Sequence, residues 1–268
     1  MVQEVPKIQP LRTLRLPRSC RTVIALVLRE MATSYGRSPG GYVWAVAEPV
    51  AGIALLTFIF SLGFHAPPLG SSFALFYASG LVPFLIYSDI SGKVAQSINF
   101  SLPLLGYPRV TLVDAILART VLSIMTQTLV CGLVFGGLLL MVGTQSRLDA
   151  TRLFQAILMA FALGFGIGTI NCFLITLYPV WQRVWSILNR PMFLLSCIVF
   201  VFETIPLPFR DWLWYNPIVH IVGMTRQGLY FSYAGEYIMP LYVYFLSLGL
   251  SVCGFLLIWL YKDRLLNR

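Results

Sequence analysis

The side chains that could carry out chemistry are few in this sequence, and they are scattered. It contains two histidines, His65 and His220, and five cysteines, with no HExxH, CxxC or other metal-ligand spacing. The pair Gly92-Lys93 is followed by valine, so it does not complete the GxxxxGK[ST] loop that cradles nucleotide phosphates. The sequence therefore predicts a protein that is not an enzyme and that holds no metal or cofactor of its own.

Acidic residues inside apolar stretches are the remaining candidates. Glu48 follows a Ser-Pro-Gly-Gly turn and the aromatic residues Tyr42 and Trp44, and it lies one helical turn into an apolar stretch. A carboxylate at that depth is costly unless it reaches water or a partner. Glu48 could therefore extend to the membrane interface, pair with an arginine or line a hydrated path. Asp89, alone in a later stretch, fits an interface residue better than a proton relay.

Composition indicates which elements position these side chains. Hydrophobic residues make up 58% of the chain and charged residues 11%, whereas a soluble domain carries about 25% charged residues. The apolar runs are continuous, as in spanning helices of about 20 residues, and they lack the alternation of barrel strands. We expect an all-α integral membrane protein with six transmembrane helices, at residues 43–64, 73–91, 113–142, 153–178, 187–205 and 238–261. The fifth is the weakest, because Pro191 and Glu203 interrupt it.

The distribution of positive charge predicts the orientation of these helices. Of the 19 Lys and Arg residues, only Arg147, Arg152, Arg210 and Arg226 fall on the side opposite the N-terminus. Lys and Arg accumulate in cytoplasmic loops, so both termini are expected in the cytoplasm (N-in, C-in). The net charge of +9 then reflects topology, and because the basic residues are spread over several loops, we expect no nucleic-acid partner.

The N-terminal region is expected to stay on the cytoplasmic side. Residues 1–20, rich in Pro and Arg, are predicted to form a flexible basic arm. Over residues 21–38 the apolar and polar side chains occupy opposite arcs, which predicts an amphipathic helix lying in the membrane interface. This helix could be an anchor or a docking surface for a partner. The transmembrane domain is then expected to cover residues 39–268.

Two later segments are too polar for ordinary spans. Residues 99–120 contain Pro103 and Pro108 and are expected to form a short cytoplasmic surface helix. Residues 206–236 combine charged and aromatic side chains, and they predict a re-entrant helix pair before the last span. Backbone that is not helical at membrane depth must be buried in protein or face a water-filled cavity. This second segment therefore predicts a mouth on the outer side.

Several features in a fixed order carry a resemblance to a known family. They are the amphipathic basic helix, the stretch YGRSPGGYVWAVAEP (35–49), a YPR motif (107–109) before the third span, and NPIVHIVGMTRQGLY (216–230) before the sixth. This order resembles the ABC-2 (type V fold) exporter permeases, and within them the capsular polysaccharide export permeases, over residues 20–265. The SPGG turn departs from the family's plainer Gly-Ser turn by a proline and an extra glycine.

The resemblance implies a subunit of an ATP-driven exporter in the bacterial inner membrane. Two copies of the chain would join two cytoplasmic ATPase subunits, and these partners would bind the ATP and Mg²⁺. The cargo would be a lipid-linked, acidic capsular polysaccharide moving from cytoplasm to periplasm, in some systems with a periplasmic adaptor and an outer-membrane protein. The implied interface helix and coupling segment contain the candidate ATPase-coupling residues Arg29, Glu30, Arg37, Tyr107, Arg109 and Asp114.

Aromatic and charged residues supply the candidates for contact with a sliding polysaccharide, because aromatic rings offer sugars a face without a fixed hydrogen-bond register. The candidates are Tyr42, Trp44, Glu48, Phe73, Tyr77, Phe84 and Tyr87. For each aromatic residue, packing in the core or at the membrane belt is the commoner role. On the outer side, Arg210 and Arg226 could attract an anionic polymer, although Arg226 could equally pair with Glu203 or Glu236.

Other functions remain open at this point. Within the same class, the cargo could be an O-antigen, a teichoic acid precursor or a drug. A membrane-embedded enzyme acting on lipid-linked sugars would need convergent acid, base or metal ligands, and the scarcity of His and intramembrane Asp or Glu counts against it. A secondary transporter would often contain internal repeats, and the sequence has no persuasive repeat.

Overall fold

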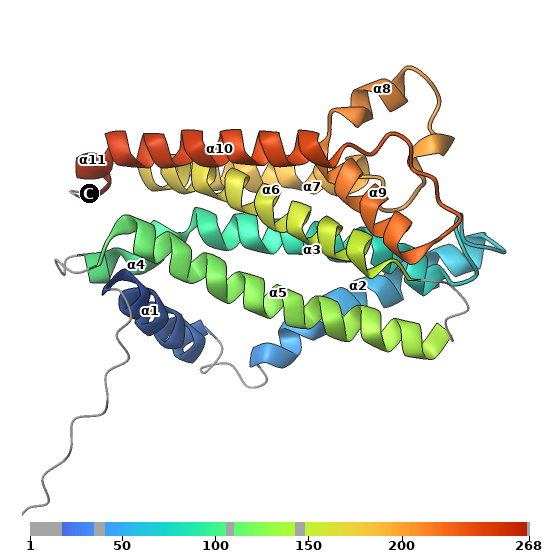
Figure 1. The fold of residues 1–268 in the computed structure, drawn as a ribbon, viewed down its shortest axis with the longest axis horizontal. Coiled ribbons are helices and arrows are strands. Elements are labelled where there is room, and N and C mark those ends of the chain that lie inside the picture. Colours follow the sequence, from blue (N-terminus) through green and yellow to red (C-terminus); the bar gives the residue numbers. More distant parts are fainter. Residues whose placement is uncertain (1–17, 35–40, 106–109, 143–147, 267–268) are drawn as a thin grey trace, which may run out of the picture.

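The computed structural model describes residues 18–34, 41–105, 110–142 and 148–266, and every regular element in these ranges is a helix. This confirms the expected all-α class. The long helices run side by side between two ends of the molecule (Figure 1). One end carries the short helices α4 (Ser97–Leu105) and α11 (Lys262–Leu266), and the other carries α8 (Phe209–Trp214). We call them the α4 end and the α8 end.

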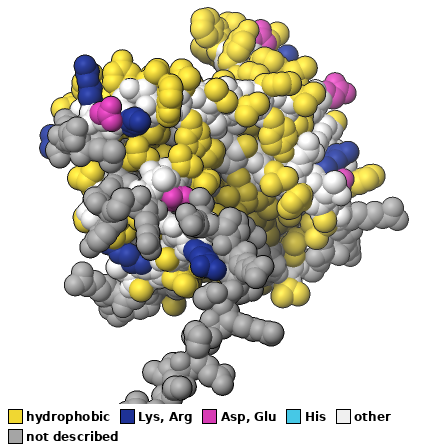
Figure 2. Space-filling view, turned by 60° about the vertical axis from the view of Figure 1, so that its left-hand side comes forward, with side chains coloured by type: hydrophobic (Ala, Val, Ile, Leu, Met, Phe, Trp, Pro, Cys, Tyr) yellow, Lys and Arg dark blue, Asp and Glu magenta, His cyan; other side chains and the backbone are white. Residues whose placement is uncertain are grey.

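Within the described residues, five helices are long and apolar enough to cross a membrane. They are α2 (Gly41–Gly63), α3 (Phe73–Ala95), α5 (Leu112–Val142), α6 (Ala150–Leu177) and α10 (Pro240–Leu260). Each agrees with one of the expected spans to within a few residues. Their outward surfaces are apolar, as at Leu140 and Phe245. Figure 2 shows hydrophobic side chains over much of the described surface on the face it presents, with charged side chains scattered among them.

The expected span at residues 187–205 is wrong as a single helix. The chain instead forms the helix α7 (Val180–Leu195), which starts earlier, contains Pro191 and has no buried residues. It ends at Leu195. The φ of Cys197 is 57°, a left-handed value that a right-handed α-helix does not contain. Turns through this residue lead to a short 3₁₀ helix at Phe202–Thr204. The helix α7 can end at Leu195 because partners distant in sequence bind the carbonyl groups of its last residue and of the turn that follows, as described below.

Two helices, α3 and α6, form the centre of the molecule. Most residues of α3 are buried, and α10, α9 (Pro217–Leu229) and α5 pack around this pair. Close approach depends on small residues: a Cβ on Gly166 would lie 2.6 Å from the Ser247 carbonyl oxygen of α10. Gly132 and Gly136, the GxxxG pair of α5, have open space instead. The close packing therefore fixes α3, α6 and α10 relative to one another.

At the α4 end, the amphipathic helix α1 (Arg18–Ser34) lies against the beginning of α5 (Figure 1). It was expected at residues 21–38, and residues 35–40 lie outside the described ranges, as does the expected basic arm up to residue 17. Its apolar face packs through Val27 on Ala118 and Leu122 of α5. At the α8 end, α8 and α9 occur where a helix pair was expected, within residues 206–236.

Candidate functional site

The aromatic residues proposed for substrate contact lie mostly inside this chain. Tyr77, Phe84 and Tyr87 of α3 are buried, and Phe73 is partly buried. Their rings pack on neighbours, Tyr77 on Phe60 with centroids 5.2 Å apart and Phe84 on Phe193 at 5.6 Å. These contacts match the core role rather than an open surface. Trp44 is exposed, and the side chain of Tyr42 lies outside what the structure describes.

Glu48 and Asp89 are brought together, which the sequence alone did not predict. Both line a small pocket of about 140 Å³ between α2, α3 and α5, together with Gln127. Asp89 accepts a hydrogen bond from the Ser123 hydroxyl at 2.6 Å and forms an ion pair with Lys93 at 3.0 Å. Glu48 is exposed beside this pocket. Glu48, the first carboxylate in the apolar part of the sequence, therefore borders a pocket that also contains the polar side chains of Asp89 and Gln127.

An ion pair joins α1 to the start of α5. The Arg119 Nε donates to a Glu30 carboxylate oxygen at 2.6 Å, and the side chains are only 11% and 8% exposed. Arg119 also donates to the Lys93 carbonyl oxygen at 3.3 Å, and its guanidinium lies 4.1 Å from the centre of the Phe100 ring of α4. One arginine therefore connects α1, α3, α4 and α5.

The other predicted coupling residues have separate positions. Asp114 caps α5: its carboxylate accepts from the Thr111 backbone N–H and hydroxyl, and the Thr111 hydroxyl accepts from the Asp114 N–H. This reciprocal pair is a capping box, which fixes the start of α5. Arg29 is exposed on α1. Arg37, Tyr107 and Arg109 lie outside the described residues.

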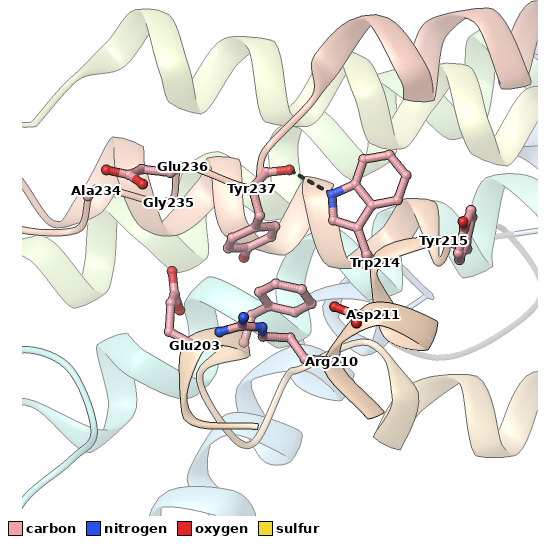
Figure 3. Close-up of a pocket in the computed structure, with 10 residues that line it drawn as sticks. Glu203, Arg210, Asp211, Trp214, Tyr215, Ala234, Gly235, Glu236 and Tyr237 are labelled. Atoms are coloured by element: carbon pink, nitrogen blue, oxygen red, sulfur yellow. Dashed lines mark hydrogen bonds between the residues drawn. The ribbon is translucent and has the colours of Figure 1, made fainter. Parts of the chain in front are cut away.

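A larger pocket of about 570 Å³ lies at the α8 end (Figure 3). We call it the outer-loop pocket; its lining includes Trp214, Tyr237, Arg210 and the carboxylates Glu203, Asp211 and Glu236. The Trp214 indole N–H donates to the Tyr237 carbonyl oxygen at 3.2 Å, which fixes one aromatic wall. The predicted Arg210 thus shares its pocket with three carboxylates, which offset its attraction for an anion.

The side chains of His220, which is buried, and Asn216, which is partly buried, hold this pocket in place. His220 accepts from the Met239 backbone N–H at Nδ1 (3.2 Å), so its Nε2 carries the proton and donates to the Trp214 carbonyl oxygen at 2.8 Å. Burial lowers the pKa of His220, which favours this neutral form. Asn216 accepts from the Ile218 N–H at the start of α9 and donates to the Leu195 carbonyl oxygen at 2.9 Å. Asn216 therefore joins the last residue of α7 to the start of α9.

Arg226, the second outer arginine, is fully buried and does not line the outer-loop pocket. Its guanidinium donates to three backbone carbonyl oxygens, those of Cys197 (2.8 Å), Phe200 (3.0 Å) and Ile198 (3.1 Å). It also lies 4.6 Å from the centre of the Phe76 ring. These bonds satisfy the carbonyl groups of the turn that follows α7, so the backbone there can leave the helix.

Sequence reasoning did not identify the roles of Arg119 and Arg226 as helix connectors. A signal for Arg119 exists, since it precedes an apolar run and Glu30 is the only carboxylate on α1. The partners of Arg226 are main-chain carbonyls, which leave no signal in residue types. Among the described residues there is no group of three or more His, Cys, Asp or Glu side chains that could hold a metal ion.

Comparison with known proteins identifies relatives along most of the chain. The ABC-2 type transporter family matches residues 21–230. The polysialic acid transport protein KpsM of Escherichia coli is 33% identical over 247 residues, which cover 91% of this chain and 93% of that protein. The capsule polysaccharide export inner-membrane protein CtrC of Neisseria meningitidis serogroup B is 26% identical, over 87% of this chain and 88% of its own length. BexB of Haemophilus influenzae, of the same description, is 25% identical over 78% of this chain and 79% of its own length.

Proposed function

Because the chain belongs to the ABC-2 type transporter family, we propose that it is the membrane permease of an ATP-driven exporter of lipid-linked capsular polysaccharide. The observation that carries this proposal is the similarity to capsule export permeases over nearly the whole chain. The chain is a multi-pass inner-membrane transport subunit rather than an enzyme. We further propose movement from the cytoplasm to the periplasm.

The arrangement of the ends supports a specific topology. The N-terminal helix α1 and the C-terminal helix α11 both lie at the α4 end (Figure 1). We assign this end to the cytoplasm, and we assign α7 with the turn after it to a sixth crossing, which returns the chain to the α8 end. Both termini are then cytoplasmic, as the distribution of Lys and Arg favours. In this assignment α1 lies in the membrane interface, and α8 and α9 close the outer mouth.

A partner supplies the energy in this proposal. The sequence has no phosphate-binding loop of its own, so two cytoplasmic ATPase subunits would bind ATP and Mg²⁺ and would contact two copies of this chain. The contact would use the exposed face of α1, which includes Arg29, and the segment around α4. The Arg119 connections support this role, because they attach α1 and α4 to two of the long helices.

The cargo is proposed to be acidic. The support is the similarity to a protein named for polysialic acid transport, a polymer of acidic sugars. A periplasmic adaptor and an outer-membrane protein would carry the polymer onward. Glu48, beside the polar pocket with Asp89, would lie at the cytoplasmic start of a hydrated path.

The test is reconstitution of the complete exporter. The chain would be expressed with its ATPase, purified in lipid nanodiscs and supplied with lipid-linked acidic polysaccharide. We expect a stable complex of two copies of each protein, whose ATP hydrolysis responds to the polysaccharide. Repeated purification without an ATPase, together with transport in cells that does not depend on nucleotide, would refute the proposal and favour a secondary transporter or an enzyme.

A further inference from the structure

A groove that the functions above do not use lies between α3 and α7. Its hollow of about 540 Å³ is lined on α7 by Gln182, Trp185, Ser186, Asn189, Arg190 and Phe193. These positions are spaced by three, one, three, one and three residues, so they form one face of the helix. The opposite wall is α3 with its cap residue, from Phe84 to Gln96. A Cβ on Gly92 of this wall would meet nothing within 4 Å, which agrees with the hollow.

The polarity of α7 is reversed relative to a helix on the surface of a soluble protein. Its other face carries Ile187, Leu188 and Leu194, all exposed and apolar. In a bilayer this apolar face can meet lipid, and the polar face is then directed toward α3. Polar side chains at membrane depth face a partner or a water-filled cavity. The α7 wall of the α3–α7 groove therefore brings four polar side chains, those of Gln182, Ser186, Asn189 and Arg190, into a lining that is otherwise largely apolar.

The groove begins near the α4 end, where α3 finishes and α7 starts. A smaller hollow of about 110 Å³ shares Gln182 and Ile175 with it and continues past Asn99 of α4. From residue 182 to residue 193, a helix advances ~16 Å, at 1.5 Å per residue. The groove thus leads from the proposed cytoplasmic end about halfway along the transmembrane region.

One polar group in the groove lacks a partner. The Asn189 amide Nδ2 donates to the Ser88 hydroxyl at 3.2 Å, while its Oδ1 is buried and has no hydrogen-bond partner among the described residues. A buried acceptor of this kind calls for a donor from outside the protein. A hydroxyl group is a suitable donor to this oxygen, because the same hydroxyl can also accept a hydrogen bond from an N–H group.

The charges of the groove favour an anion. Arg190 is the one charged residue in its lining, and no carboxylate from the described part of the chain lines it. A guanidinium recognises carboxylate and phosphate groups through paired, charge-assisted hydrogen bonds. The Trp185, Phe84 and Phe193 rings add flat apolar surfaces beside the amide groups.

We propose that the α3–α7 groove binds a sugar unit of the exported glycan together with its adjacent anionic group. The amides of Gln182 and Asn189 would bind hydroxyls, Trp185 would pack on the sugar ring, and Arg190 would bind the anion. That anion is either the carboxylate of an acidic sugar or the phosphate that links the glycan to lipid. The proposal rests on the proposed function, and it adds a cytoplasmic-side binding site to it.

The first experiment tests whether the groove is hydrated. Full-length protein in complex with its ATPase is prepared in nanodiscs, with the exposed Cys20 and Cys253 replaced by serine. Ser186→Cys, in the groove, and Leu188→Cys, on the apolar face, are then labelled with a charged thiol reagent. We expect labelling of the groove variant at least about tenfold faster, because a thiol in lipid stays protonated. Equal rates would overturn the proposal.

The second experiment measures protection of Ser186→Cys by three probes: a sialic acid oligomer, glycerol phosphate and neutral maltoheptaose. Protection by the oligomer alone identifies the sugar carboxylate as the anion, and protection by glycerol phosphate alone identifies a phosphate. Arg190→Gln should weaken this protection about tenfold, as expected for loss of a charge-assisted bond. Arg183→Gln, on the same helix but outside the groove lining, should not change it.

Absence of protection by both anionic probes, or equal protection by maltoheptaose, would overturn the proposal. The same preparation tests the proposed function separately. Copurification of the ATPase and its stimulation by polysaccharide do not depend on labelling at residue 186. If polysaccharide stimulates ATP hydrolysis but Ser186→Cys is not labelled, the groove proposal is refuted and the proposed exporter function stands. If Ser186→Cys is labelled and protected but polysaccharide does not stimulate ATP hydrolysis, the proposed exporter function is refuted.

Discussion

Each end of this molecule is organised around one arginine, mostly buried at the α4 end and fully buried at the α8 end, and the two arginines have different partners. At the α4 end, Arg119 pairs with the carboxylate of Glu30 on a separate helix, α1. At the α8 end, Arg226 binds the main-chain carbonyl groups of the turn after α7. An ion pair between two helices can open and close while both helices persist. Carbonyl groups in a buried turn have no such alternative, since without Arg226 they would be unsatisfied.

The difference divides the protein into a fixed part and a part able to move. The outer mouth proposed at α8 and α9 is built on a connection that must stay intact for the chain to remain folded. The proposed ATPase contact is built on one that can separate without unfolding the long helices. In an exporter, force applied to α1 would then reach α3 and α4 through Arg119.

The largest expected effect comes from Arg226→Leu. The variant removes the donor from three carbonyl groups, two of them buried and one partly buried, at about 1–3 kcal/mol for each buried group left unsatisfied. We expect the protein to be lost from membranes or to unfold at much lower temperature in detergent. Lysine should not rescue it, because a single ammonium cannot reproduce the guanidinium geometry.

The control for this prediction is Arg210→Leu, which changes an arginine of the same end that lines the outer-loop pocket. It should leave the level of folded protein close to normal. An Arg226→Leu protein as stable as the parent would show that the α8 end does not depend on this arginine, and the comparison would fail.

Glu30→Ala should release α1 without unfolding the rest of the protein. Loss of the carboxylate leaves Arg119 unpaired near the surface, at about 1–3 kcal/mol. Limited trypsin digestion at Arg21 and Arg29 should then become faster, and transport per ATP hydrolysed should fall. The double variant Glu30→Arg with Arg119→Glu should restore transport per ATP hydrolysed toward normal, and digestion is compared only between the parent and Glu30→Ala, because the new arginine adds a trypsin site. Unchanged digestion would mean that apolar packing alone holds α1.

Glu48→Ala tests whether the part able to move, at the α4 end, extends into the membrane as far as Glu48. Glu48 shares a pocket with Asp89, which pairs with Lys93, and the Lys93 carbonyl in turn accepts from Arg119. We expect export to fall several-fold with membrane insertion unchanged, because the proposed path loses a polar group. Glu48→Gln separates the effect of charge from that of hydrogen bonding. Normal export by the alanine variant at equal protein level would remove Glu48 from the path.

The smallest effect is a pH dependence of the fixed end. Burial lowers the pKa of His220 from its usual 6.5, so the folded state binds this proton less well than the unfolded state. The stabilisation is fully present above pH 6.5 and declines as the pH falls below it, because the unfolded state then takes up a proton that the buried imidazole resists. Thermal unfolding at pH 7.5 and 5.5 measures this. His220→Gln should reduce the pH difference, and His65→Gln, at an exposed position, should preserve it.

The parts of this structure that sequence predicted are those set by local pattern. Five spans follow from apolar runs of sufficient length, and α1 follows from its two-sided distribution of residues. The helix boundary at Leu195 did not follow, because Asn216 and Arg226, which bind the carbonyl groups there, lie 21 to 29 residues further on. Hydropathy also obscured α7, since its polar face lowers the average of a helix that has a fully apolar opposite face.

The candidate site shows the same division. The carboxylate Glu48 could be identified from its depth in an apolar stretch, but its proximity to Asp89 depends on how α2 and α3 pack. The aromatic residues of α3 could be listed from sequence, but their burial depends on neighbours such as Phe60 and Phe193. The pairing of Glu30 with Arg119 joins residues 89 positions apart.

The turn after α7 also has a consequence for synthesis of the protein. The ribosome makes Arg226 between 26 and 29 residues after the carbonyl groups that it binds. At roughly 5–20 residues per second, this interval lasts one to several seconds. If α7 forms the proposed sixth crossing, its polar face and its unsatisfied turn keep it from resting stably in lipid by itself during that time. Its insertion must therefore wait for α9, so the last part of the membrane domain assembles as a unit rather than helix by helix.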